Sequence, residues 1–143
     1  MSLLSASDQQ TLREMFADMK QTVTILFFTQ TIGCETCDDT KRILGELTGL
    51  TDRIVVDEVN LVLEKERAAE YGIDRAPGLA LLVDGKDTRI RMLGAPAGYD
   101  FMSLVDAILA AGGASDMALS EESVGLLATV TEPRRIEVFV TPT

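Results

Sequence analysis

The sequence contains no histidine, no tryptophan and only two cysteines, Cys34 and Cys37. A structural zinc site needs four ligands, usually Cys or His, so one copy of this chain cannot build such a site and no metal is expected. Four thiolates contributed by two copies would still suffice for a cluster shared between chains. Proteins that rely on disulfide scaffolds contain many more cysteines. Two cysteines among 143 residues therefore indicate a chemical role rather than a scaffold.

Basic residues are also few, because the chain has 13 Lys and Arg against 23 Asp and Glu and a net charge of −10. Nucleic acids and anionic membranes repel such an acidic surface, so neither is an expected partner. No apolar run reaches the length that spans a bilayer, and the first residues lack the basic-then-apolar pattern of a signal peptide. The composition therefore predicts a cytoplasmic protein.

Proline is scarce as well, with four residues in the chain, whereas 46% of the residues are hydrophobic. A chain of this size buries roughly two-thirds of the surface that its unfolded state exposes. It therefore needs no cross-link in order to fold, and we expect one or at most two compact units.

The most informative stretch runs from Val23 to Cys37. Its first part, residues 23–29, is β-branched and aromatic without strict alternation, which predicts a strand covered on both faces. Cys34 and Cys37 follow where a helix is expected to begin, and residues three apart share one helix face. Their Cα atoms would then lie within the range of about 4.4 to 6.8 Å that a disulfide tolerates. A Cys-x-x-Cys pair in this position indicates a redox-active dithiol, and two cysteines buried as small apolar residues are the structural alternative.

The two cysteines are predicted to have different roles. If Cys34 lies at the helix N-terminus, unpaired backbone N–H groups and the macrodipole favour its thiolate, which would make it the attacking group. Cys37, one turn further along and more buried, would resolve the mixed disulfide. The negative charges of Glu35, Asp38 and Asp39 oppose another anion nearby. We therefore expect a smaller lowering of the Cys34 pKa than in strongly oxidising dithiol proteins.

The flanking segments predict alternating helices and strands. Ser7 and Gln10 form a capping box that opens an amphipathic helix before the first strand. A second strand over residues 53–56 follows the cysteine-bearing helix and completes a parallel β-α-β unit. Asn60 is predicted to cap a third helix over residues 61–71.

A turn at Asp84-Gly85 signals a hairpin. It joins an apolar strand over residues 79–83 to a strand over residues 88–93, so these two strands are predicted to be antiparallel. Pro77 stands just before the first of them, where a proline removes a ladder donor only at the strand end. A helix over residues 99–109 closes this part of the chain.

This order of elements, with a dithiol at the start of the second helix and Pro77 before the hairpin, resembles the thioredoxin and glutaredoxin superfamily. The resemblance implies an α/β fold in which a mixed four-stranded sheet is flanked by helices. It also implies that the Ala76–Pro77 bond is cis and faces the dithiol, and that the backbone of Ala76 pairs with an extended substrate segment. Gly33, Ala76 and Pro77 are accordingly the predicted substrate-binding residues, beside the catalytic Cys34 and Cys37.

The end of the chain repeats its beginning. An N-capped helix is followed by a strand over residues 135–140, and Thr141-Pro142-Thr143 echoes Thr29-Gln30-Thr31. We expect residues 1–113 to form one thioredoxin-like unit and residues 114–143 to be the truncated start of a second. Two units in tandem resemble the glutaredoxin-like protein disulfide oxidoreductases of archaea and thermophilic bacteria. A strand without its own sheet is a pairing hazard, so residues 135–140 are predicted to join an edge of the first sheet or to pair two copies into a homodimer.

The resemblance implies a dithiol–disulfide oxidoreductase that reduces, forms or exchanges disulfides in protein substrates, with no cofactor beyond the Cys34–Cys37 disulfide. An upstream reductase, such as a thioredoxin-reductase-like flavoenzyme, would supply its electrons. Glutaredoxins that use glutathione carry Thr-Val-Pro where this chain has Arg75-Ala76-Pro77, which argues against glutathione as a substrate. The alternative is a non-catalytic docking or electron-relay module of the same fold, as in the duplicated thioredoxin-like segment that feeds peroxiredoxin reduction. A bare scaffold function comes third.

Overall fold

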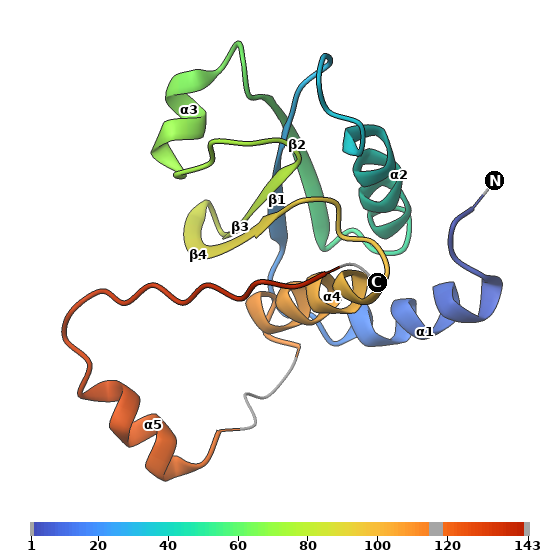
Figure 1. Cartoon of the computed structure of the whole chain (residues 1–143). Helices are drawn as coiled ribbons and strands as arrows, with labels where there is room; N and C mark the ends of the chain where they lie inside the picture. The colour runs from blue at the N-terminus through green and yellow to red at the C-terminus, as the bar shows by residue number, and fades with distance from the viewer. Residues whose placement is uncertain (1, 115–118, 142–143) are drawn as a thin grey trace.

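A mixed four-stranded sheet forms the centre of the computed structural model, which describes residues 2–114 and 119–141. The strands are β1 Val23–Thr29, β2 Ile54–Asn60, β3 Gly78–Val83 and β4 Lys86–Leu93. They lie in the order β2-β1-β3-β4 (Figure 1). β1 and β2 are parallel, whereas β3 is antiparallel to both β1 and β4. The predicted α/β class and the mixed sheet are therefore confirmed.

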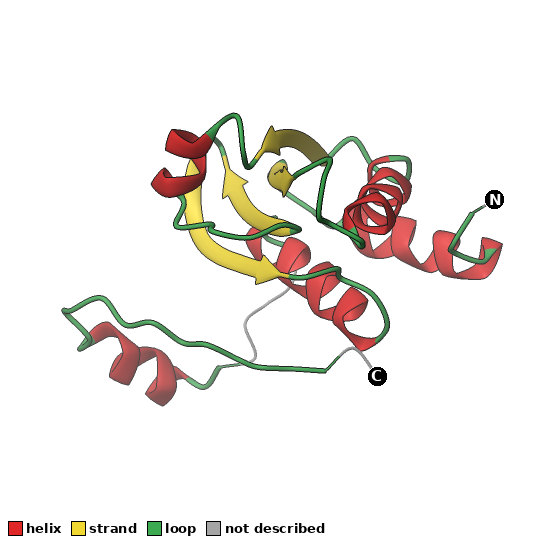
Figure 2. Cartoon of the chain, turned by 45° about the horizontal axis from the view of Figure 1, so that its top comes forward, coloured by secondary structure: helices red, strands yellow, loops and turns green. Residues whose placement is uncertain are grey.

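Four helices flank this sheet (Figure 2). They are α1 Ala6–Ala17, α2 Cys37–Thr48, α3 Lys65–Glu70 and α4 Tyr99–Ala111. Side chains of α1, α2 and α4 share one large hydrophobic core with the sheet. α3 covers a smaller apolar cluster. Among the described helices, none is long and apolar enough to cross a membrane.

β1 is covered on both faces, as its apolar run predicts. Ile25 and Phe27 belong to the large core, whereas Leu26 and Phe28 lie in the cluster beneath α3. Successive side chains of a strand point to opposite faces, so a strand between two apolar layers needs an uninterrupted hydrophobic run. Each of these four side chains is at most 2% exposed, and burying one contributes about 1.5–3 kcal/mol.

α1 begins earlier than its predicted capping box. Ser5 is the N-cap: its hydroxyl accepts a hydrogen bond from the Asp8 amide at 3.1 Å, and the Asp8 carboxylate accepts one from the Ser5 amide at 3.3 Å. Ser7 and Gln10 therefore lie inside the helix, and the prediction that they form the capping box is wrong. The pair Ser5 and Asp8 is favoured over Ser7 and Gln10 as the capping box, because the helix macrodipole also stabilises the Asp8 carboxylate in the first turn.

β2 is longer and α3 shorter than predicted. β2 extends to Asn60, and α3 begins only at Lys65. The Asn60 side-chain oxygen accepts hydrogen bonds from the amides of Val62 and Leu63, both at 3.0 Å. These contacts form a turn over residues 61–63, so Asn60 caps this turn and not the helix itself.

The hairpin between β3 and β4 is confirmed. Asp84 and Gly85 form its turn with φ angles of 51° and 75°, the left-handed conformation that a tight hairpin turn of this kind requires at both positions. α4 begins at the predicted residue, Tyr99, and runs on to Ala111.

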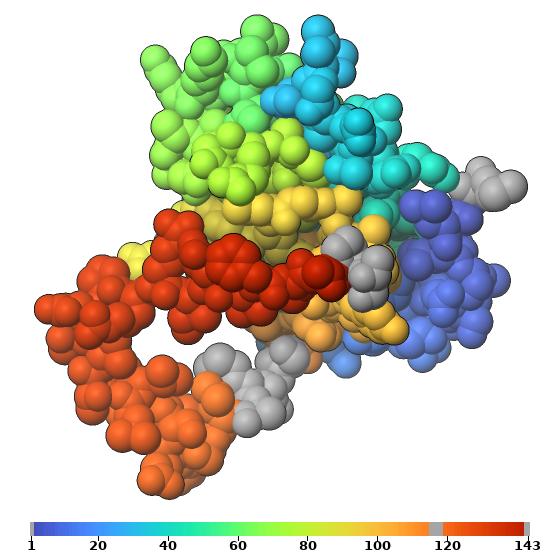
Figure 3. Space-filling view, in the orientation of Figure 1, coloured from blue at the N-terminus to red at the C-terminus, as the bar shows by residue number. Residues whose placement is uncertain are grey.

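Residues 119–141, the described residues of the C-terminal part, form a helix but no strand. This helix, α5 Glu121–Ala128, is capped by Ser120, and none of its residues is buried. Figure 3 shows α5 standing apart from the body of the protein. Residues 130–141 have no regular secondary structure and join neither edge of the sheet. The prediction that residues 135–140 form an edge strand of this sheet is therefore wrong.

Residues 135–140 would bury little apolar surface at an edge of the sheet, which explains why they do not join it. Ile136, Val138 and Phe139 are 79–89% exposed. Helices already flank the sheet on both faces, so docking at an edge would remove little of this apolar surface from water. Pairing of two copies and the unit boundary after residue 113 stay predictions. In the second copy of the repeated Thr-x-Thr motif, residues 142–143 lie outside the described residues.

Candidate redox site

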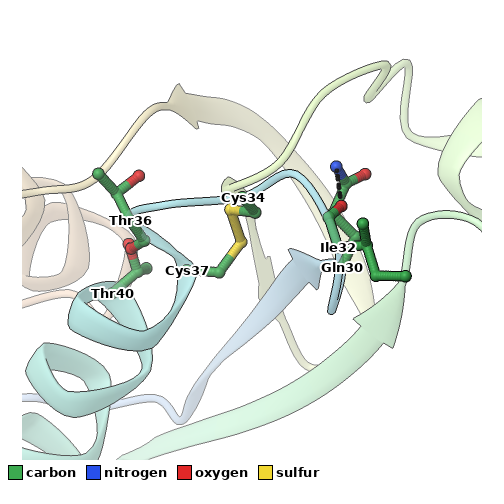
Figure 4. Close-up of a disulfide and its surroundings, with 6 residues drawn as sticks. All are labelled: Gln30, Ile32, Cys34, Thr36, Cys37 and Thr40. Atoms are coloured by element: carbon green, nitrogen blue, oxygen red, sulfur yellow. Dashed lines mark hydrogen bonds between the residues drawn. A yellow bond between two sulfur atoms is a disulfide. The ribbon is translucent and has the colours of Figure 1, made fainter.

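A disulfide joins Cys34 to Cys37 shortly after the end of β1 (Figure 4). Their Cα atoms are 5.5 Å apart, inside the range expected from the spacing. α2 begins at Cys37, and a turn at residues 35–36 precedes it. Cys34 therefore lies just before the helix and not in its first turn.

The two cysteines differ in exposure. Cys34 is half-buried, whereas Cys37 is only 4% exposed. A substrate can therefore reach Cys34 more easily than Cys37. Access is one of the factors that set the rate of thiol–disulfide exchange, so the geometry favours Cys34 as the thiol that meets a substrate.

Local contacts hold the loop between β1 and Cys34. The side-chain amide of Gln30 donates a hydrogen bond to the carbonyl of Ile32 at 3.0 Å (Figure 4). Gly33 has a φ of +77°, a conformation in which any side chain would be strained. The Ile32 side chain is 87% exposed. The loop therefore carries an apolar side chain in solvent two residues before the disulfide.

Hydrogen bonds from the buried residue Thr40 hold the first turn of α2. Thr36 is the N-cap, but its side chain makes no capping hydrogen bond. The buried hydroxyl of Thr40 donates to the Thr36 carbonyl at 2.8 Å, and the Thr40 amide donates to the same oxygen at 3.0 Å. No buried side-chain polar atom of the described residues lacks a partner. This pair of bonds secures the turn that carries Cys37.

A polar cavity of about 470 Å³ opens beside the disulfide. It is lined by Thr29, Gln30, Thr31, Cys34, Cys37, Asp38, Lys41, Glu58, Asn60 and Glu64. Inside it, the Lys41 ammonium on α2 lies 2.8 Å from the Glu58 carboxylate on β2. The hydrogen bond from Lys41 to Glu58 raises the pKa of Lys41 above its ordinary value, so this side chain is protonated at neutral pH.

Sequence reasoning did not single out Lys41, Glu58 or Glu64. A signal existed for Lys41, because a residue four positions after Cys37 lies on the same helix face. Glu58 reaches the site through the parallel pairing of β1 with β2, in which it stands opposite Phe27. In the part of the chain that the structure describes, no group of three or more His, Cys, Asp or Glu is placed to hold a metal ion.

The predicted substrate-binding residues lie outside this cavity. The Ala76–Pro77 peptide bond is cis, as the resemblance implies. Gly78, the first residue of β3, pairs with Phe28 near the end of β1, so Pro77 lies at the sheet end from which the loop to Cys34 departs. The cavity lining includes neither Ala76 nor Pro77 nor Gly33.

No protein-family model and no curated protein matches the sequence. Solved structures do match it. The N-terminal domain of the alkylhydroperoxide reductase AhpF from Enterococcus faecalis is 27% identical with a TM-score of 0.78, over 87% of this chain and 60% of that chain. A protein disulfide oxidoreductase from Aeropyrum pernix is 24% identical with a TM-score of 0.73, over 87% of this chain and 54% of that one.

The chain thus spans only 54–60% of the length of these two structures. A thioredoxin variant from Halobacterium salinarum, 19% identical, matches with a TM-score of 0.53 over 78% of this chain and 89% of that chain. Likeness at that level of identity concerns the fold alone. Taken with the sheet order, the cis proline and the disulfide, these matches establish that the chain has a thioredoxin-like fold with a Cys-x-x-Cys disulfide at the start of α2.

Proposed function

We propose that this chain is a thiol–disulfide oxidoreductase whose Cys34–Cys37 pair reduces, forms or exchanges disulfides in proteins. The observation that carries the proposal is the disulfide at the start of α2, with Cys34 accessible and Cys37 covered. A disulfide that closes so short a loop stabilises a protein less than one that closes a long loop, so stability alone is a weak reason for a cross-link at this position. We also propose the cytoplasm as its location.

In the reducing direction, the Cys34 thiolate attacks one sulfur of a substrate disulfide. A bond forms between the Cys34 sulfur and that substrate sulfur, and the substrate S–S bond breaks. The leaving sulfur departs as a thiolate and takes up a proton. The Cys37 thiolate then attacks the Cys34 sulfur, which forms the Cys34–Cys37 disulfide and releases the second substrate thiol.

Each cycle transfers two electrons from the dithiol to the substrate, and the oxidised protein needs an external reductant. We propose an upstream flavoenzyme of the thioredoxin-reductase type for that step, or a small dithiol in vitro. In the oxidising direction the same bonds form and break in reverse order.

Substrate backbone is proposed to pair with Ala76. Within the described residues Ala76 takes part in no backbone hydrogen bond, so its amide and carbonyl groups can pair with an extended peptide. Pro77 and Gly33 are proposed to shape the two chain segments that meet the peptide. These roles follow from the family resemblance and from the position of Pro77 at the dithiol end of the sheet.

Two single variants test the proposal, and each is the control for the other because each retains one thiol. Cys34→Ser is expected to lower the rate of insulin reduction by dithiothreitol to the rate measured without the protein. Cys37→Ser should accumulate a mixed disulfide between Cys34 and the substrate, visible by mass spectrometry, because no resolving thiol is present. If Cys34→Ser reduced insulin as fast as the unmodified protein, the proposal would be refuted.

The likeness to the N-terminal domain of an alkylhydroperoxide reductase supports a second candidate, an electron-relay module. Such a module would pass two electrons to one dedicated peroxide-reducing partner and would ignore general protein disulfides. The reduced protein would then fail to reduce insulin, yet its dithiol would be oxidised by the disulfide of a peroxidase. Measuring both reactions with the same reduced sample separates the two candidates.

A further inference from the structure

The surface around the disulfide carries an excess of negative charge. Glu35 lies between the two cysteines, and Asp38 and Asp39 follow them, all exposed to solvent. Asp39 lies 3.6 Å from the guanidinium of Arg42. Within the described residues, Glu35 and Asp38 form no salt bridge. Asp38 is attracted by the Lys41 ammonium at longer range. Residues 34–42 thus hold three carboxylates and two cations, Lys41 and Arg42.

The cavity beside the disulfide extends this charge away from the sulfur atoms. Its lining includes three carboxylates, Asp38, Glu58 and Glu64, and a single cation, Lys41. The Lys41 ammonium is bonded to Glu58 at 2.8 Å and also attracts Asp38. Glu64 lies 3.6 Å from the guanidinium of Arg67, which is shared with Asp57. Carboxylates therefore still outnumber the cations around the cavity. A group that enters the cavity from solvent therefore meets a negative potential.

We infer that the preferred substrates are disulfides flanked by basic residues, with a Lys or Arg side chain placed in this cavity while Cys34 meets the substrate sulfur. This inference rests on the proposed function and names its substrate class. Clefts lined by charge of one sign raise the local concentration and the association rate of oppositely charged ligands. Acidic disulfides are repelled by the same field.

A structural role for these carboxylates makes a different prediction. Acidic residues in the first turn of a helix stabilise it through the macrodipole, and they also disfavour the Cys34 thiolate. Either effect changes the reactivity toward every substrate by the same factor. The ratio of rates for a basic and an acidic substrate is therefore the quantity that isolates charge selection.

The test uses three synthetic peptides with the same internal disulfide, flanked by Lys, by Gln or by Glu. Oxidation of the reduced protein by each peptide is followed by stopped flow at low salt and at high salt. We expect the Lys peptide to react about tenfold faster than the Glu peptide at low salt, with the Gln peptide between them. The ratio should fall toward one at high salt, because exposed charges are then screened.

Asp38→Asn and Glu35→Gln should each lower the Lys-to-Glu ratio. Asp106→Asn is the matched control, because it removes one exposed carboxylate from α4 outside the cavity and should leave the ratio unchanged. Equal rates for the Lys and Glu peptides would overturn the inference and leave the proposed function intact. Failure to react with all three peptides would overturn the proposed function, and the inference with it.

Discussion

Reduction of the Cys34–Cys37 disulfide is expected to lower the free energy of unfolding by about 2 kcal/mol. The cross-link joins residues three apart, and the chain-entropy relation gives about this value for so short a loop at 25 °C. A reduced form could recover the difference only if the fold stabilised a thiolate. Glu35, Asp38 and Asp39 are the carboxylates that flank the cysteines in sequence, and their negative charge opposes that anion.

Urea unfolding of the oxidised protein and of the protein in dithiothreitol measures this difference. With a slope of about 1–3 kcal/mol per molar urea, the midpoint should fall by about 1 M on reduction. The double variant Cys34→Ser with Cys37→Ser is the control. Its urea midpoint should equal that of the reduced protein and should not change when dithiothreitol is added.

Because folding and disulfide formation are thermodynamically linked, the same free-energy difference also sets the reduction potential of the disulfide. About 2 kcal/mol corresponds to a reduction potential about 40 mV lower in the folded protein than in its unfolded chain. The folded protein would then favour the disulfide and act as a mild reductant toward its substrates. A reduced form at least as stable as the oxidised form would refute this reasoning, because it would show that the fold stabilises the thiolate despite its acidic neighbours.

Two further predictions concern the frame around the site. At Gly78 an added Cβ would lie 2.8 Å from a methyl carbon of Ile73, so Gly78→Ala should destabilise the protein by about 1–3 kcal/mol in urea unfolding. Gly45 is exposed in the interior of α2, where a new Cβ would have no atom within 4 Å apart from the adjacent backbone of its own helix. Gly45→Ala should therefore stabilise the protein by about 0.5–1 kcal/mol. Effects of the same sign for the two variants would contradict the packing around Gly78. The hydrogen bond from Arg91 holds the pKa of Asp87 below its ordinary value, so its contribution is present at neutral pH and is lost as the pH falls through that lowered pKa. Asp87→Asn should therefore cost about 0.5–1 kcal/mol at pH 7 and reduce the acid dependence of thermal unfolding, and an unchanged acid limb would show that this pair does not contribute.

Short-range chemistry made most of the fold predictable. The apolar run at residues 23–29 and the turn at Asp84-Gly85 are local signals, and the structure contains both elements. Asn60 shows where local signals stop predicting the structure. Its side chain accepts hydrogen bonds from backbone amides, as predicted, but these amides belong to the turn before α3 and not to the helix. The Glu64 carboxylate accepts a hydrogen bond from the backbone amide of Asn60 at 2.8 Å. A contact of this kind leaves no regular pattern in a sequence.

The site, too, has a part that local sequence predicts and a part that it does not. Cys34 and Cys37 are adjacent enough in sequence for their spacing to predict the disulfide. Glu58 faces the same cavity only because β2 pairs with β1 in one particular register. Register over a strand pair is set by the whole buried pattern, so a residue that depends on it cannot be assigned to the site from its own neighbours.

The cavity beside the disulfide has two unlike walls. One belongs to α2, whose residues Cys37 and Leu44 are buried in the large core. The other, at Asn60 and Glu64, leads into α3, which has six residues and only Ala68 buried. Segments with so few buried contacts open locally at a small free-energy cost. Under the proposed function, the reacting sulfur atoms would be held by a well-buried helix, and α3 on the opposite side would be the part that moves to admit substrates of different width.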